Sequence, residues 1–155
     1  PLQIANYIAT LVSGGELLQP HLLKAVKSYD SAEVLAVGST EPVSTVTISP
    51  STLEAVKKGM LGYTQPGGSV YNAFRSCVVT AGAKTGTSQL GGDQTENGLF
   101  VCFAPYDDPE IAVAIVIEHA TWGANAASTG VEILNAYFAA EEDGSPVTGE
   151  NQLLP

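Results

Sequence analysis

Three strand-like runs separated by short turns constrain the fold of this chain more than any other feature. They cover Val78 to Thr87, Leu99 to Ala104 and Ile111 to Glu118, and all are rich in β-branched or aromatic residues. The segments between them contain "GGDQTENG" and "PYDDPE", which are clusters of turn-forming residues. Because consecutive strands with short connections tend to pair with each other, the sequence predicts an antiparallel β-meander.

The last of these runs, residues 111–117, reads "IAVAIVI" and contains no polar residue. This pattern predicts a strand in the interior of the sheet with both faces covered. The run is also the longest purely apolar one, and it is far shorter than the roughly 20 residues that a membrane-crossing helix needs. We therefore expect no membrane contact by this chain itself.

Helical periodicity predicts the elements that cover the sheet. A first helix is expected over residues 2–13, with Gly14-Gly15 as its stop signal. A second begins at Pro50 after Ser49 as N-cap, and a third runs from about 124 to 140. The apolar residues at helical spacing are Ile4, Ile8, Leu11 and Val12 in the first helix, Leu53, Val56 and Met60 in the second, and Ala127, Val131, Leu134 and Phe138 in the third.

The segments between these elements give weaker signals. We expect a short strand near residues 22–26, a polar loop over 28–42 and a second strand over 43–48. The stretch "VYNAFRS" fits either a helical turn or a loop. The predicted fold class is therefore α+β, with helices packed on a three-stranded antiparallel meander.

The length of 155 residues suits one compact domain. We predict that this domain covers residues 1–140. Residues 141–155, "EEDGSPVTGENQLLP", are acidic and rich in turn formers, and we expect them to form a flexible tail.

The charge balance narrows the function. Sixteen acidic residues against six basic ones give a formal charge of -10, which repels polyphosphates and anionic lipids and argues against nucleic-acid binding. Because basic residues are so few, the position of each one helps to indicate where an anionic ligand could bind. Only Lys84 and Arg75 lie near the first strand-like run of the meander.

Lys84 lies in the segment "AGAKTGTSQL", between small residues. A strand that receives a substrate along its edge needs unpaired backbone, a cation and hydroxyls for an anionic group, and one position without a side chain. Lys84, Thr85, Gly86 and Thr87 supply the side-chain requirements, and Gly86 allows close approach to the backbone. Strand alternation directs Lys84 and Gly86 to one face, and Thr85 and Thr87 to the other. Taken alone, the triplet favours a solvated strand lysine before a bulge glycine, and only the surrounding sequence favours the binding edge.

Several ordered motifs make residues 1 to about 138 resemble the penicillin-binding proteins, and most closely their class B members. "PLQIANYIATLVSGGELLQPHLLKAV" is similar to the family's helix after its second active-site motif, with the Gly-Gly and Pro-His connection. "AKTGTSQ" resembles the third motif, and "NGLFVCFAPYDDPEIAVAIVIE" resembles the two strands that follow it. The resemblance implies a partial penicillin-binding-protein or serine β-lactamase-like transpeptidase fold, of which residues 1–140 are the C-terminal portion.

The resemblance also implies an activity and its residues. The family cross-links peptidoglycan stem peptides through a serine acyl-enzyme formed on D-Ala-D-Ala, and β-lactams bind the same site. By resemblance, Lys84 supports the electrostatics and proton relay, and Thr85 and Thr87 hold the terminal carboxylate. Gly86 completes the motif, and the Thr87 backbone N–H supplies one oxyanion donor. No cofactor or metal is implied.

The nucleophile is missing from this sequence. No serine has a lysine three residues on, and no serine or tyrosine has an asparagine two residues on. The chain begins with Pro1, so we expect a piece of a longer polypeptide that lacks the N-terminal half of the transpeptidase domain. We expect this fragment alone to be inactive. Its parent is expected at the extracytoplasmic face of the bacterial cell membrane, anchored by a segment absent here.

Two other functions remain open from the residues alone. One is a fragment of a class A penicillin-binding protein, β-lactamase or D,D-carboxypeptidase. The other is a non-catalytic module that captures a peptide along the strand edge. A Ser-x-x-Lys motif upstream would indicate the enzyme, and its absence the module.

The remaining reactive side chains give no firm motif. Cys77 and Cys102 fit no metal spacing; they are either buried apolar residues or a disulfide pair. His21 and His119 lack a nucleophile or carboxylate at a recognisable offset. The remaining candidates are Asp107, Asp108 and Glu110 as a solvated turn or a metal site, Tyr106 and Trp122 as core or rim aromatics, and Arg75 as a surface or substrate-attracting cation.

Overall fold

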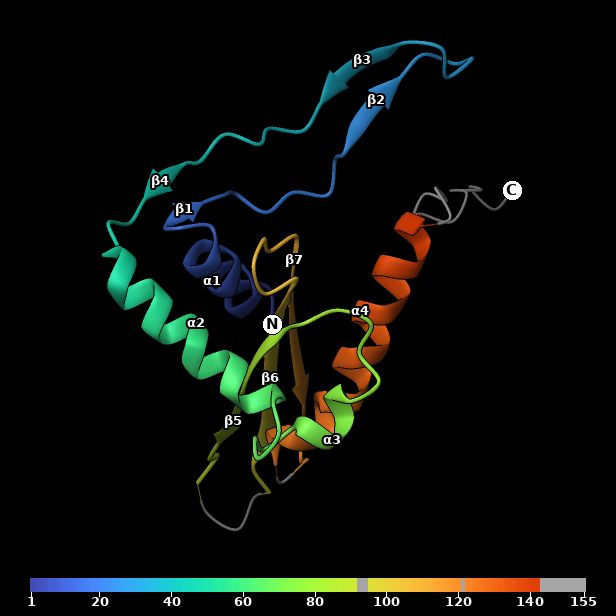
Figure 1. Cartoon of the computed structure of the whole chain (residues 1–155). Coiled ribbons are helices and arrows are strands. Elements are labelled where there is room, and N and C mark those ends of the chain that lie inside the picture. The colour runs from blue at the N-terminus through green and yellow to red at the C-terminus, as the bar shows by residue number, and fades with distance from the viewer. Residues whose placement is uncertain (92–94, 121, 143–155) are drawn as a thin grey trace.

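A three-stranded antiparallel sheet lies between two groups of helices in the computed structural model, which describes residues 1–91, 95–120 and 122–142 (Figure 1). Helices α1 and α2 lie on one side of the sheet, and α3 and α4 on the other. This confirms the α+β class. The main elements are α1 (Leu2–Val12), α2 (Pro50–Thr64), α3 (Tyr71–Phe74), β5 (Gly82–Ser88), β6 (Asn97–Ala104), β7 (Ile111–Ile117), a 3-10 turn η1 (Gly123–Ala126) and α4 (Ala127–Glu142).

The antiparallel meander is confirmed, in the order β5-β6-β7. Lys84 lies opposite Val101, and Gly86 lies opposite Leu99. The first strand begins at Gly82 instead of Val78, because the backbone before it bonds to other elements. Val78 N–H donates to Asn135 Oδ1 of α4 at 2.9 Å, and the Thr80 carbonyl accepts from Tyr106 N–H at 2.8 Å.

The prediction that residues 111–117 lie in the sheet interior is wrong for the residues described. β6 is the central strand, and β7 pairs with β6 alone. Both faces of β7 are nevertheless covered: Ala112 and Ala114 pack on the α1 side, while Val113 and Ile115 pack on the α4 side. An uninterrupted apolar run indicates that both faces of a strand are buried. It does not indicate whether one or two neighbouring strands pair with it.

Side chains of β6 alternate between two apolar clusters, one on each face of the sheet. Val101 and Phe103 pack with Ile8 of α1 and Met60 of α2. On the other face, the cluster joins β6 to α3 and α4. Its largest members are Phe74, Phe100, Cys102, Val131 and Leu134.

The helix signals in the sequence are confirmed at their ends. Ser49 caps α2 by accepting from Thr52 N–H at 3.2 Å. α1 ends at Val12, and Gly15 follows with a φ of +107°. A Cβ at Gly15 would lie 1.9 Å from the Val46 carbonyl oxygen, so glycine is required there. The apolar stripe of α4 packs as predicted, and "VYNAFRS" forms the single helical turn α3.

An arm formed by the chain between α1 and α2 extends from the body (Figure 1). At its base β1 (Glu16–Leu17) pairs with β4 (Ser44–Thr45), and further out β2 (Ala25–Lys27) pairs with β3 (Val34–Val37). The predicted loop over 28–42 is wrong, since it contains β3. The predicted strands over 22–26 and 43–48 are shifted or shortened, because only the cross-arm pairing decides which residues become strand.

The predicted flexible tail lies outside the described residues from 143 onward, while 141 and 142 belong to α4. Within the described ranges, no helix has both the length and the apolar character that crossing a bilayer requires.

We predict that the Thr64 hydroxyl fixes α2 against β5. Thr64 is 5% exposed, and its Oγ1 donates to the carbonyl oxygen of Ala81 at 2.7 Å. Thr64→Val leaves that buried carbonyl without this donor, so it should lower the free energy of unfolding by about 1–3 kcal/mol in urea titrations. Thr64→Ser keeps the hydroxyl and serves as control; equal losses in both variants would contradict the role of the hydrogen bond.

Candidate functional site

The strand that carries Lys84 lies at an edge of the sheet. Among the residues that the structure describes, β5 pairs with β6 only. Its other edge therefore has no strand beside it in the described part of the chain. This is the unpaired backbone that a strand needs in order to receive a substrate along its edge.

Alternation along β5 directs Lys84 to the α1 and α2 side. A Cβ on Gly82 would approach the Phe103 ring and Met60, which belong to that side. Ala83 is fully buried in the cluster on the opposite face. Because side chains alternate, Lys84 returns to the side of Gly82, as predicted.

The Lys84 ammonium has two neutral partners. Nζ donates to the backbone carbonyl of Thr85 at 2.6 Å, and it lies 4.6 Å from the centre of the Tyr63 ring. That distance is within the range of cation–π attraction. Neither partner carries a negative charge. The two contacts therefore orient the Lys84 side chain without pairing its ammonium with an anion.

Lys84 and Tyr63 line one cleft of about 410 Å³. Its walls come from α1, α2, β5 and β6, and they are mainly apolar. The remaining lining residues are Ile4, Tyr7, Ile8, Leu11, Val56, Gly59, Met60 and Val101. The site is therefore a single cation at the wall of a largely apolar cleft, an arrangement suited to fixing one anionic group.

The pKa of Tyr63 is lowered by this arrangement. Hydrogen bonding to Lys84 is the largest cause, the ammonium charge and a hydrogen bond to Thr85 act in the same direction, and desolvation opposes them. The phenol hydroxyl therefore lies close to both Lys84 and Thr85. Tyr63 was missed in the sequence because no motif spacing links it to Lys84, and only the packing of α2 on β5 brings them together.

The backbone around Gly86 is open on one side and tightly packed on the other. A Cβ on Gly86 would meet only Leu99 Cβ, at 3.5 Å, which is ordinary contact. A Cβ on Gly123 of η1 would lie 2.5 Å from the Gly86 carbonyl oxygen and 2.1 Å from that of Leu99. The turn η1 therefore supports this end of β5, while space remains beside Gly86. Thr85 is half-buried and Thr87 is exposed.

Both histidines make hydrogen bonds outside the Lys84 cleft, His21 within the arm and His119 after the end of β7. His21 Nε2 donates to the Ser39 carbonyl at 3.0 Å and ties the two sides of the arm together. His119 N–H donates to Asn97 Oδ1 at 3.1 Å, at the far end of β7. Neither histidine lines the cleft with Lys84.

The other polar and aromatic candidates also lie outside this cleft. Asp107 and Asp108 are exposed in the turn before β7, and Arg75 is exposed at the end of α3. Tyr106 stacks on Phe103 at 6.2 Å between ring centres, as a rim aromatic would, whereas Trp122 is 68% exposed. Within the described residues, no three His, Cys, Asp or Glu side chains are grouped to hold a metal ion.

The two cysteines are free thiols. Cys102 is fully buried in the core on the α4 side, and Cys77 is half-buried beside the same core. Burial raises the pKa of Cys102 to about 12, with a further rise from the neighbouring Cys77, and burial also raises the pKa of Cys77. Neither thiol is therefore activated as a nucleophile.

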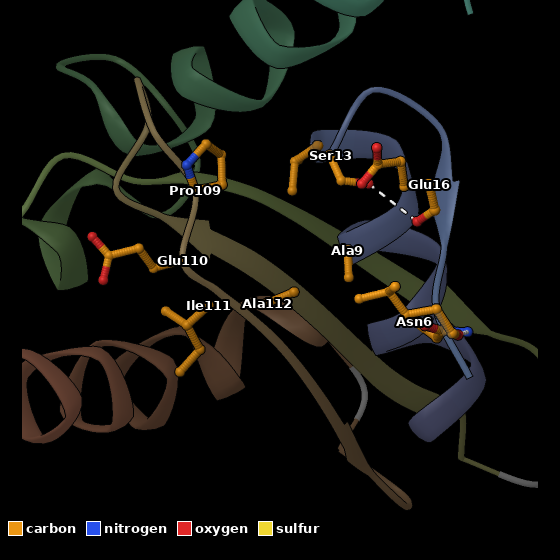
Figure 2. A pocket seen from close by; sticks show the side chains of 10 residues that line it. Asn6, Ala9, Ser13, Glu16, Pro109, Glu110, Ile111 and Ala112 are labelled. Carbon is orange, nitrogen blue, oxygen red and sulfur yellow. Dashed lines mark hydrogen bonds between the residues drawn. The ribbon is translucent and has the colours of Figure 1, made fainter. Parts of the chain in front are cut away.

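A smaller pocket of about 190 Å³ lies on another face of α1 (Figure 2). Asn6 and Ala9 of α1 form one wall, and the segment leading into β7 from Pro109 to Ala112 forms the other. Ser13 Oγ donates to the Glu16 carbonyl at 3.2 Å at its rim. The pocket contains neither a cation nor a paired nucleophile and base, so it is not the candidate site.

Comparisons with known proteins all match this chain to penicillin-binding-protein transpeptidases. Residues 1–139 match the family described as the penicillin binding protein transpeptidase domain. The chain is 31% identical over 134 residues to peptidoglycan D,D-transpeptidase MrdA of Escherichia coli, a match that covers 77% of this chain and 21% of the relative. It is 30% identical over 130 residues to penicillin-binding protein 2A of Bacillus subtilis, with 76% and 18% covered. The chain thus spans about a fifth of the length of these relatives.

Solved structures show the same similarity. The D,D-transpeptidase domain of a peptidoglycan glycosyltransferase from Eggerthella lenta matches with a TM-score of 0.71 and 26% identity, over 92% of this chain and 32% of that one. PBP2 of Pseudomonas aeruginosa in complex with WCK 5153 matches in fold with a TM-score of 0.72 and 24% identity, over 100% and 33%.

We predict that the buried thiols resist modification in the folded chain. A pKa of about 12 leaves only about one Cys102 thiol in ten thousand ionised at about pH 8, and thiol reagents attack the thiolate. Ellman's reagent should react slowly with Cys77 and with Cys102 only after denaturation. In a Cys77→Ala variant, rapid reaction of the native protein would contradict the burial of Cys102.

Proposed function

Because the chain belongs to the transpeptidase domain family of the penicillin-binding proteins, with relatives of class B, we propose that it forms the Lys-Thr-Gly wall of a D,D-transpeptidase site. The parent protein would cross-link peptidoglycan stem peptides and react with β-lactams. The observation that carries the proposal is the position of Lys84, Thr85 and Gly86 on an open strand edge beside the largely apolar cleft.

Lys84 is the electrostatic centre of the proposed site. A D-Ala-D-Ala terminus and a β-lactam both present a carboxylate, and a chain with a formal charge of -10 needs a local cation to attract one. The partners of the Lys84 ammonium are a ring and a carbonyl oxygen, and neither is an anion that would compete with a ligand carboxylate for it. It would also stabilise negative charge that develops near the attacking oxygen.

Thr85, Gly86 and Thr87 complete the proposed wall. Hydroxyls of Thr85 and Thr87 would bind the substrate carboxylate, and the space beside Gly86 lets an extended peptide approach β5. The backbone N–H of Thr87 would act as one oxyanion donor. A peptide aligned along the free edge of β5 would have its reacting carbonyl fixed by main-chain hydrogen bonds.

The nucleophile of the proposed reaction lies in the part of the parent that this chain does not include. There, a serine oxygen would form an ester with the penultimate D-Ala carbonyl and release the terminal D-Ala. An amine of another stem peptide would then take the acyl group. We propose residues 1–140 as the C-terminal portion of this domain, with the preceding half of the domain as partner and the extracytoplasmic face of the cell membrane as location.

A non-catalytic peptide-binding module is the second candidate, and the free edge of β5 supports it equally. The upstream sequence of the parent gene separates the two. A Ser-x-x-Lys motif there supports the transpeptidase, and its absence supports the module.

We expect the 155-residue chain alone to form no covalent adduct with penicillin, because no serine in it has a lysine partner at motif spacing. The measurement is incubation with a fluorescent penicillin, followed by denaturing electrophoresis. The complete parent protein is the positive control. A labelled band from the chain alone would show that a nucleophile exists within these residues.

In the complete parent protein, we expect Lys84→Ala to slow acylation by penicillin with little change in melting temperature. One charge contact in a poorly solvated site is worth roughly 3 kcal/mol, or about 100-fold in rate, so the second-order rate constant should fall by at least about tenfold. Lys58→Ala removes an exposed lysine of α2 and is the matched control. If both variants acylate alike, Lys84 is a solvated strand lysine and the proposal fails.

A further inference from the structure

Lys84 has a long, flexible side chain on an exposed position of an edge strand. Such a side chain loses considerable rotamer freedom when it is held in one direction, so a site that depends on it needs something to hold it. The Thr85 carbonyl at 2.6 Å is one holding group, but it belongs to the adjacent residue and cannot by itself select the side of the strand.

Tyr63 is the second holding group, and it comes from a different element. Its ring centre lies 4.6 Å from the Lys84 ammonium, and the two side chains share the wall of the same cleft. An aromatic face attracts a cation without neutralising it, whereas an aspartate or glutamate at this place would compete with the carboxylate of a ligand.

The fold fixes Tyr63 independently of Lys84. The next residue, Thr64, is buried and bonded to the Ala81 carbonyl at 2.7 Å. The carbonyl of Tyr63 itself accepts from Val70 N–H at 3.1 Å. Tyr63 is also partly buried against the apolar cluster on the α3 and α4 side of the sheet. The fold therefore fixes the backbone that carries the ring, and the lysine is the longer and more flexible side chain of the pair.

We propose that Tyr63 is a positioning residue of the transpeptidase site, whose ring holds the Lys84 ammonium at the wall of the cleft. The inference rests on the proposed function for the identity of the ligand, but the contact itself does not. Tyr63 acts through Lys84, so its effect on the reaction should vanish when Lys84 is absent. The lowered pKa of Tyr63, caused first by hydrogen bonding to Lys84, is consistent with this contact.

The test is a double-mutant cycle in the complete parent protein, measured as the second-order rate of penicillin acylation. A cation–π contact is worth enough that Tyr63→Leu should lower this rate by at least about fivefold. Tyr63→Phe keeps the ring but removes the hydroxyl, so its rate should lie between that of the parent and that of Tyr63→Leu. Tyr71→Leu is the control, since Tyr71 is a half-buried tyrosine on α3, on the opposite side of the sheet.

The decisive comparison is made in the Lys84→Ala background. There Tyr63→Leu should cause less than about a twofold further loss, because positioning has nothing left to act on. Additive losses would show a general structural effect and overturn the proposal, as would a Tyr63→Leu variant that acylates like the parent. If Lys84→Ala is itself silent, the proposed function fails instead, so the two failures are distinguishable.

A second measurement tests the contact without any reaction. In the 155-residue chain with ¹³C-labelled tyrosine, the Tyr63 resonance is assigned from Tyr63→Phe and titrated by NMR. Because Lys84 lowers the pKa of Tyr63, Lys84→Ala should raise it. Tyr7 of α1 is the other tyrosine among the residues that line the cleft, and its resonance serves as internal reference. An unchanged Tyr63 titration would show that the two side chains do not meet.

Discussion

The antiparallel pairing of β6 with both of its neighbours is the constraint on which the rest of the structure depends. β6 aligns β5 through pairs such as Lys84 with Val101, and it aligns β7 on its other side. Its own side chains enter both apolar clusters, Phe103 toward α1 and α2, and Phe100 toward α3 and α4. A slip of one residue along this pairing would exchange the two faces and move Lys84 away from its cleft.

The candidate site exists because β5 is buried at its beginning and exposed towards its end. The first part of the strand is covered: Gly82 lies against Phe103 and Met60, and Ala83 is fully buried. From Lys84 onward the side chains become partly or fully exposed, and the outer edge has no strand beside it in the described residues. The strand is thus packed into the core at one end and accessible to a ligand at the other. The packed end supports the part of the strand that would bind.

The electrostatic character of the site depends on the partners that hold the Lys84 side chain in place as much as on its charge. The chain carries sixteen acidic and six basic residues, yet the partners of the Lys84 ammonium in the structure are an aromatic ring and a carbonyl oxygen. Lys57 of α2 likewise lies over the rings of Phe103 and Tyr106. Aromatic partners keep these cations ordered while their charge remains available to a ligand.

The sequence by itself determined the elements whose signals are local. Periodicity placed α1, α2 and α4, the cap at Ser49 and the stop at Gly14-Gly15 marked their ends, and short turns specified the meander. The motif around Lys84 identified the strand that carries the candidate site. Tertiary structure alone decided that β7 lies at an edge of the sheet in the described residues, that residues 34–37 form a strand, and that Tyr63 meets Lys84. Each of these depends on a partner distant in sequence, and a local pattern records which faces of an element are apolar without recording what packs against them.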